Sequence, residues 1–103
     1  MKNWRQSKEY RKWRIQVIRR DKRCVICDSN KKRTAHHIND ASYHPDLRFD
    51  IDNGVCLCYK CHMNFHTNYK RSYREKCTIY DWNNFRSLLN YLSDLDHINK
   101  TEE

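Results

Sequence analysis

Two pairs of cysteines and two pairs of histidines are the residues of this sequence with the clearest capacity for chemistry. Cys24 and Cys27 form one CxxC pair, and Cys58 and Cys61 form a second. Each pair can place two thiolates on one ion, so the four complete a tetrahedral, closed zinc site of the structural type. Two disulfides or a redox pair are the alternatives. An intracellular location, where thiols stay reduced, favours zinc.

Four of the six histidines lie close to these cysteines in the sequence. His62 and His66 are four residues apart, so a helix would direct both imidazoles to one side, where they can share a metal ion. His36 and His37 are adjacent, and on a strand they would face opposite sides. One could then join the ion while the other faces a substrate, as metal-assisted phosphodiester hydrolysis requires. The alternatives are surface histidines or additional structural zinc ligands.

A helix over residues 7–20 is expected to precede these sites. Ser7 can cap it, and Tyr10, Trp13 and Val17 recur at helical spacing. This stripe is expected to pack on the core, and the outer face is basic.

Residues 22–53 are expected to be irregular, with a brief strand at 34–38. Residues 55–57 predict a second short strand. Gly54, the only glycine, follows Asn53 and predicts a turn with positive φ.

Two helices are expected in the second half of the chain. The first runs from His62 to about Arg71. The second can be capped by Thr78 or Asp81, and residues from Asn99 onward are expected to fray. Its core stripe, at helical spacing, comprises Phe85, Leu88, Leu89, Leu92 and Leu95.

The remaining cysteines and histidines lack a paired spacing. Cys56 and Cys77 are interpreted as buried small hydrophobes rather than ligands. His44 and His97 are interpreted as surface residues.

Composition indicates one small basic domain spanning residues 1–103. Only 38% of residues are hydrophobic, 33% are charged, and the net charge is +8. A chain this short and polar usually needs a stabilising metal or disulfide. The expected segments are a basic N-terminal helix (1–21), a zinc-stabilised core (22–70), a C-terminal helical segment (71–98) and a flexible tail (99–103).

The positive charge fits a polyanionic partner such as DNA, with RNA not excluded, although a solvated basic surface is the alternative. No apolar run approaches the roughly 20 residues needed to span a bilayer, and the first residues lack a secretory signal. A cytoplasmic protein without membrane contact is therefore expected. The candidate nucleic-acid contacts are Arg11, Arg14, Arg19, Arg20, Lys31, Lys32, Arg33 and Arg48.

Over roughly residues 20–66 the sequence resembles the HNH endonucleases. The matching motifs are Cys24-Val25-Ile26-Cys27, Ala35-His36-His37-Ile38, Asn53-Gly54-Val55-Cys56-Leu57-Cys58 and Cys58-Tyr59-Lys60-Cys61-His62. The run Met63-Asn64-Phe65-His66 looks like versions in phage HNH proteins. The resemblance implies a small α+β fold, a ββα-metal, treble-clef-like finger with a Cys₄ zinc, flanked by an N-terminal and a C-terminal helix.

The resemblance also implies roles for individual residues. His37 would be the general base, and Asn53 would orient the loop that carries it. His36 and His62 would hold the catalytic ion, with His66 as a third ligand. Many relatives have Asp where this chain has His36; an imidazole set shifts preference toward Zn²⁺, Ni²⁺, Co²⁺ or Mn²⁺, although abundance keeps Mg²⁺ possible.

The function expected from the resemblance is hydrolysis of DNA phosphodiesters to 5′-phosphate and 3′-hydroxyl ends, in a bacterial cell or a phage-infected host. The chain is expected to be a monomer or a weak homodimer. A histidine base predicts rates that fall below about pH 6. The principal alternative is a non-catalytic zinc-finger module that binds nucleic acid; a zinc domain that binds proteins is disfavoured by the positive charge.

Overall fold

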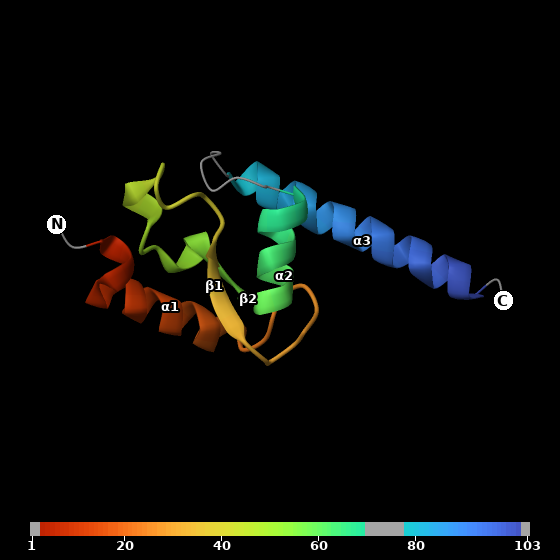
Figure 1. The fold of residues 1–103 in the computed structure, drawn as a ribbon, viewed down its shortest axis with the longest axis horizontal. Coiled ribbons are helices and arrows are strands. Elements are labelled where there is room, and N and C mark those ends of the chain that lie inside the picture. Colours follow the sequence, from red (N-terminus) through yellow and green to blue (C-terminus); the bar gives the residue numbers. More distant parts are fainter. Residues whose placement is uncertain (1–2, 70–77, 102–103) are drawn as a thin grey trace.

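Helices flank a two-stranded antiparallel sheet, in agreement with the predicted α+β class (Figure 1). The computed structural model describes the backbone of residues 3–69 and 78–101 and the side chains of residues 3–67 and 78–90. The elements are a 3₁₀ turn (Trp4–Gln6), α1 (Lys8–Asp21), β1 (Arg33–His37), two further 3₁₀ turns (Pro45–Leu47 and Ile51–Asn53), β2 (Gly54–Cys58), α2 (Tyr59–Asn64), a π-helical turn (Phe65–Tyr69) and α3 (Ile79–Thr101).

One face of the sheet is covered by α1. The Ser7 side chain accepts a hydrogen bond from the Tyr10 N–H, which confirms the predicted cap. Trp13 and Val17 are fully buried and pack with Ala35 of β1. The predicted helix and its core stripe are therefore confirmed.

The prediction of a positive φ at Gly54 is wrong. Gly54 has φ −133°, in the extended region, and begins β2. A Cβ atom there would lie 2.6 Å from Trp13 Cζ2 and 2.6 Å from Val17 Cγ2. The glycine is needed because α1 packs directly on the backbone of β2, not because the chain turns.

Gly54→Ala is therefore expected to lower the free energy of unfolding by about 2 kcal/mol, within the range for overpacked cores. Urea denaturation of wild type and variant measures the change. Val17→Ala makes room for the new methyl group, so the double variant should lose less than the sum of the two single variants. Additive losses would show that the contact with Val17 is not the cause.

The other face of the sheet is covered by α2, the π-helical turn and the start of α3. Leu57, Phe65, Trp82 and Phe85 form this part of the core. At the start of α3, the Asp81 carboxylate accepts hydrogen bonds from the Thr78 N–H and hydroxyl. Both residues proposed as caps thus act together at the predicted position.

The predicted core stripe of α3 is only partly correct. Phe85 is buried and Leu89 packs against the core, but Leu88 is 46% exposed. Trp82, which was not predicted, takes the inner position one turn earlier. Trp82, Phe85 and Leu89 therefore set the packed face of α3, and Figure 1 shows that the later part of this helix extends away from the sheet. The side chains of Leu92 and Leu95 lie outside those described.

Other boundaries differ slightly from expectation. The helix predicted from His62 begins three residues earlier, at Tyr59, and becomes π-helical at Phe65. The α3 backbone remains helical to Thr101, beyond the predicted start of fraying at Asn99. Cys56 is fully buried, as predicted.

His44 is only half-exposed, whereas a surface position was expected. Cys77 and the side chain of His97 lie outside the described residues, as does the predicted helical end at residues 70–71. Among the described helices, none combines the length and apolar character needed to cross a bilayer.

Candidate functional site

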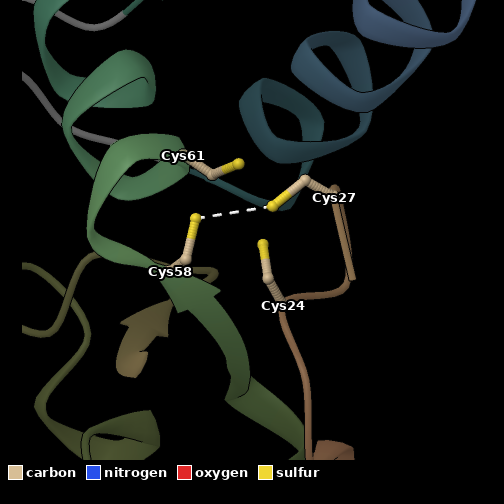
Figure 2. Close-up of side chains that lie close together, drawn as sticks. All are labelled: Cys24, Cys27, Cys58 and Cys61. Carbon is tan, nitrogen blue, oxygen red and sulfur yellow. Dashed lines mark hydrogen bonds between the residues drawn. The ribbon is translucent and has the colours of Figure 1, made fainter. Parts of the chain in front are cut away.

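The four paired cysteines converge on one point at the base of α2 (Figure 2). Cys24 and Cys27 come from the loop after α1, Cys58 ends β2, and Cys61 lies in the first turn of α2. Their sulfur atoms all lie within 4.8 Å of one another, and none is in a disulfide. Cys27 Sγ and Cys58 Sγ are 3.5 Å apart. Four sulfurs so arranged could hold a structural metal ion, and the chemistry of the set suits zinc.

The backbone around Cys24 stabilises negative charge on its sulfur. Burial opposes the thiolate, but hydrogen bonds from the backbone of Cys27, Cys58 and Ile26 outweigh it and lower the pKa of Cys24 to about 7. Burial raises the pKa of Cys61. A metal ion bound by the four sulfurs would stabilise the thiolate form that metal binding requires.

A second cluster consists of His36, His62 and His66, whose ring nitrogens could converge on one ion within 4.8 Å. The ring centroids are 5.1 Å apart for His36 and His62, and 4.8 Å for His62 and His66. His36 is only 3% exposed, and its Nε2 atom has no hydrogen-bond partner among the described residues. A buried polar atom normally has a partner, so the orphaned nitrogen fits a metal ligand.

Hydrogen bonding orients His62 for coordination. The Thr34 hydroxyl donates to the Leu57 carbonyl (2.9 Å), which uses its only hydrogen. Thr34 Oγ1 therefore accepts from His62 Nδ1–H, 2.9 Å away. Because Nδ1 of neutral His62 carries the proton, its Nε2 has a lone pair that can coordinate a metal ion. Such outer partners fix the tautomer of ligating histidines. Sequence spacing gave no signal for Thr34.

The three clustered histidines are held in their neutral form. Burial lowers the pKa of His36 well below its ordinary value of 6.5, and the neighbouring histidines lower it further. Burial and His66 lower the pKa of His62 to about 4. Burial also lowers the pKa of His66. Neutral imidazoles at neutral pH are the form that binds metal.

His37 faces the other side of β1, as the strand alternation predicted. Its ring stacks on Trp13 with centroids 4.0 Å apart and planes 5° from parallel. His37 Nε2 lies 3.0 Å from the Arg48 carbonyl oxygen. Because a carbonyl only accepts, Nε2 carries the proton and Nδ1 keeps its lone pair. Burial lowers the pKa of His37 below 6.5, against the opposing effect of that carbonyl.

Asn53 is buried and joins the ends of the loop that follows β1. Its Oδ1 accepts from the backbone and side-chain amides of Asn39, at 2.8 and 3.2 Å. Its Nδ2 donates to the carbonyls of Asn39 and Leu47, at 3.0 and 3.2 Å. Through these bonds Asn53 holds the segment that carries the Arg48 carbonyl. The orienting role expected for Asn53 stays a prediction.

The three clustered histidines and His37 line one cleft of about 190 Å³. Its walls include His36, His37, His62 and His66. Trp4 and Arg5, which the sequence did not suggest, form its rim. The Trp4 ring contacts His37 edge-on at 5.7 Å. The candidate base and the candidate metal ligands therefore reach the same space from opposite faces of one strand.

The eight candidate nucleic-acid contacts occupy different environments. Arg20 binds the Asp21 carboxylate and the carbonyls of Ile51 and Gly54, so its guanidinium has structural partners. Arg48 donates to the Ala41 carbonyl and lies 4.6 Å above the Trp4 ring, beside the cleft. The other six are exposed on α1 and on the approach to β1: Arg11, Arg14, Arg19, Lys31, Lys32 and Arg33.

Comparison with known proteins identifies no relative. The chain matches no protein-family model, and no curated protein or solved structure matches it significantly.

Proposed function

We propose that this protein is a metal-dependent nuclease of the HNH type that hydrolyses DNA phosphodiesters. The observation that carries the proposal is the shared cleft, which is lined both by His37, whose Nδ1 keeps its lone pair, and by the three clustered histidines, of which His36 has a buried Nε2 without a hydrogen-bond partner among the described residues. The resemblance of residues 20–66 to HNH endonucleases supports it independently. The two-stranded sheet followed directly by α2 matches the order expected of a ββα finger.

The residues divide the work of hydrolysis between them. His36, His62 and His66 would hold a divalent ion, which when bound stabilises the negative charge that develops on the phosphate and the departing 3′ oxygen. His37 Nδ1 accepts a proton from water as the water attacks phosphorus. The Arg48 carbonyl, held in place through Asn53, keeps the His37 ring in the productive tautomer. Trp13 fixes the plane of that ring.

The four-cysteine site would hold a second ion with a different duty. Its sulfur set is closed, so it leaves no position for substrate. Because Cys58 and Cys61 flank the start of α2, the structural ion fixes the helix that carries His62. The proposed protein therefore binds two metal ions per chain, only one of which takes part in the reaction.

Cleavage of supercoiled plasmid with added Zn²⁺, Ni²⁺, Mn²⁺, Co²⁺ or Mg²⁺ tests the proposal. Wild type should nick DNA with at least one of these ions, and His62→Ala should lose that activity. His44→Ala is the matched control, because His44 lies outside the cluster. Absence of metal-stimulated cleavage of both DNA and RNA, with one metal per chain, would instead indicate the non-catalytic zinc module.

Thr34→Val should weaken binding of the reactive ion by about 10–100-fold, the usual cost of losing an outer partner of a ligand. Valine keeps the shape of threonine but cannot accept the His62 Nδ1–H bond. Titration of the zinc-loaded protein with Co²⁺ or Ni²⁺, followed by absorbance, measures the affinity. Thr34→Ser retains the hydroxyl and should bind close to wild type. Equal affinities for the valine and serine variants would contradict the assigned hydrogen bond.

A further inference from the structure

A second concave surface, distinct from the cleft lined by the four histidines, lies between the C-terminal half of α1 and the segment that enters β1. It encloses about 600 Å³. Its apolar floor is formed by Ile15 and Ile18. Among the described residues its lining contains no carboxylate, whereas it contains five cationic side chains: Arg14, Arg19, Lys22, Lys32 and Arg33. We call this surface the basic groove.

The basic groove lies next to the cleft lined by the four histidines, which we call the histidine cleft. Tyr10 lines the cleft, while Arg14 and Ile18 line the groove. These residues are spaced four apart, so they form one stripe along α1. Eight residues of α-helix span about 12 Å. Along β1, Arg33 lines the groove, and Ala35 and His37 on the same face of the strand line the cleft, two and four residues or about 7 and 13 Å away. The two sites are therefore neighbours on one path.

We propose that the basic groove binds the sugar–phosphate backbone of the nucleic acid whose reacting phosphodiester occupies the histidine cleft. Successive phosphates of one DNA strand advance about 3.4 Å along the duplex axis. The separation of about 7–13 Å thus places the groove about three nucleotides from the reacting phosphate. This position rests on the proposed nuclease function, but phosphate binding in the groove does not.

Hydrogen bonds prepare part of the groove for an anion. Arg33 Nη1 donates to the Lys22 carbonyl at 2.8 Å, which ties the strand entrance to the end of α1. A guanidinium has five N–H donors, so this bond leaves others for phosphate oxygens. Arg14 Nη2 also approaches the Arg33 carbonyl, at 3.5 Å. These two hydrogen bonds connect α1 to the start of β1, so they fix the positions of the arginines on the two sides of the groove.

Two of the lysines occupy unusual backbone conformations. Lys22 ends α1 with φ 67°, and Lys32 precedes β1 with φ 49°. Glycine or asparagine is the usual residue where φ is positive, particularly just after a helix. Asp28, which does not line the groove, also has a positive φ of 65°, so the conformation is not confined to this surface. At Lys22 and Lys32, however, a charged residue stands where glycine would be less strained, as is common at functional sites.

The test compares two charge-matched triple variants. Arg14→Gln, Arg19→Gln and Lys32→Gln remove charge from the groove. Lys8→Gln, Lys12→Gln and Lys60→Gln remove the same charge from exposed positions outside it. Fluorescence anisotropy with a labelled 30-base-pair DNA, zinc-loaded protein and no added divalent ion measures affinity from 50 to 300 mM salt.

The groove triple is expected to bind DNA on the order of 100-fold more weakly at 0.1 M salt. The slope of log K against log salt should become shallower by about 2.7, or 0.9 for each lost phosphate contact. The control triple should lose much less. Equal losses in the two triples would overturn the proposal, because net charge alone would then explain binding. A groove triple that binds anionic lipid vesicles poorly but DNA normally would overturn it too.

A second variant separates binding from folding. Lys22→Gly with Lys32→Gly relieves the backbone strain, so the melting temperature should stay the same or rise while DNA affinity falls about tenfold or more. Unchanged affinity in this stable variant would contradict the proposal. Because these readouts need no cleavage, they stand apart from the nuclease assay: an inactive protein that binds DNA through the groove would refute only the nuclease function.

Discussion

Substitution of His37 by alanine is expected to lower the rate of DNA cleavage by about 10²–10⁴-fold, the usual cost of removing a general base. The reason is that His37 lines the cleft and keeps a basic Nδ1 lone pair, because its Nε2–H donates to the Arg48 carbonyl. Initial rates of plasmid nicking under saturating metal measure the effect. DNA affinity should change little, because the basic groove lies about 7–13 Å away.

His37→Gln is the informative companion variant. The glutamine amide can still donate to the Arg48 carbonyl, but it has no basic nitrogen for water. A rate as low as that of His37→Ala would assign the loss to the missing base, whereas near-normal cleavage by the glutamine variant would reduce His37 to a positioning role.

The pH profile gives a further readout of the same residue. Burial lowers the pKa of His37, so the neutral, active form persists to lower pH than an exposed histidine would allow. The rate of wild type should therefore be constant above pH 6.5 and fall only as pH drops through the lowered pKa. His37→Gln has no imidazole at this position to protonate. Its residual rate should therefore fall less at low pH than the rate of wild type does.

Cys27→Ser is expected to destabilise the fold by more than about 3 kcal/mol, although Cys27 is exposed. An ordinary surface substitution changes stability by about 0.5 kcal/mol or less. A structural zinc supplies about 10–16 kcal/mol of binding energy, which is as large as the net stability of about 5–15 kcal/mol of a typical domain. Chelation of this ion should accordingly unfold the wild-type protein. Circular dichroism during urea denaturation, with zinc counted per chain, measures both effects.

Cys56→Ala provides the matched control for the cysteine prediction. Cys56 is fully buried but lies outside the cluster of four sulfurs. Loss of its sulfur should cost about 1 kcal/mol, as for a small truncation in a core, and should leave the zinc content unchanged. The exposed cysteine should thus matter more than the buried one. The opposite order would show that the sulfur cluster holds no stabilising ion.

Local patterns in the sequence were enough to predict most elements and which cysteines and histidines are candidate ligands. The spacing within each CxxC pair, the four-residue step from His62 to His66 and the alternation of His36 and His37 are short-range features. Their geometry follows from the helix or strand that contains them. The same holds for α1, whose stripe of Trp13 and Val17 repeats at the helical period.

Contacts between distant segments decided the rest. Gly54 is required by the close approach of α1, and His62 is oriented by Thr34, a hydroxyl 28 residues earlier in the chain. Leu88 fits the helical stripe but is 46% exposed, because the face of α3 that packs on the core is set by Trp82, Phe85 and Leu89, and Leu88 lies to one side of it. No local periodicity encodes which element will pack against another.

The four paired cysteines and the four histidines near them show the same difference between local spacing and tertiary packing. The sequence by itself determined that four cysteines and four histidines were available at ligand spacings. Only the tertiary structure brought three histidines together, left His36 Nε2 without a partner, and turned His37 toward Trp13 and the Arg48 carbonyl. Residue spacing sets the direction of a side chain within its own element, whereas the packing of elements sets which side chains meet.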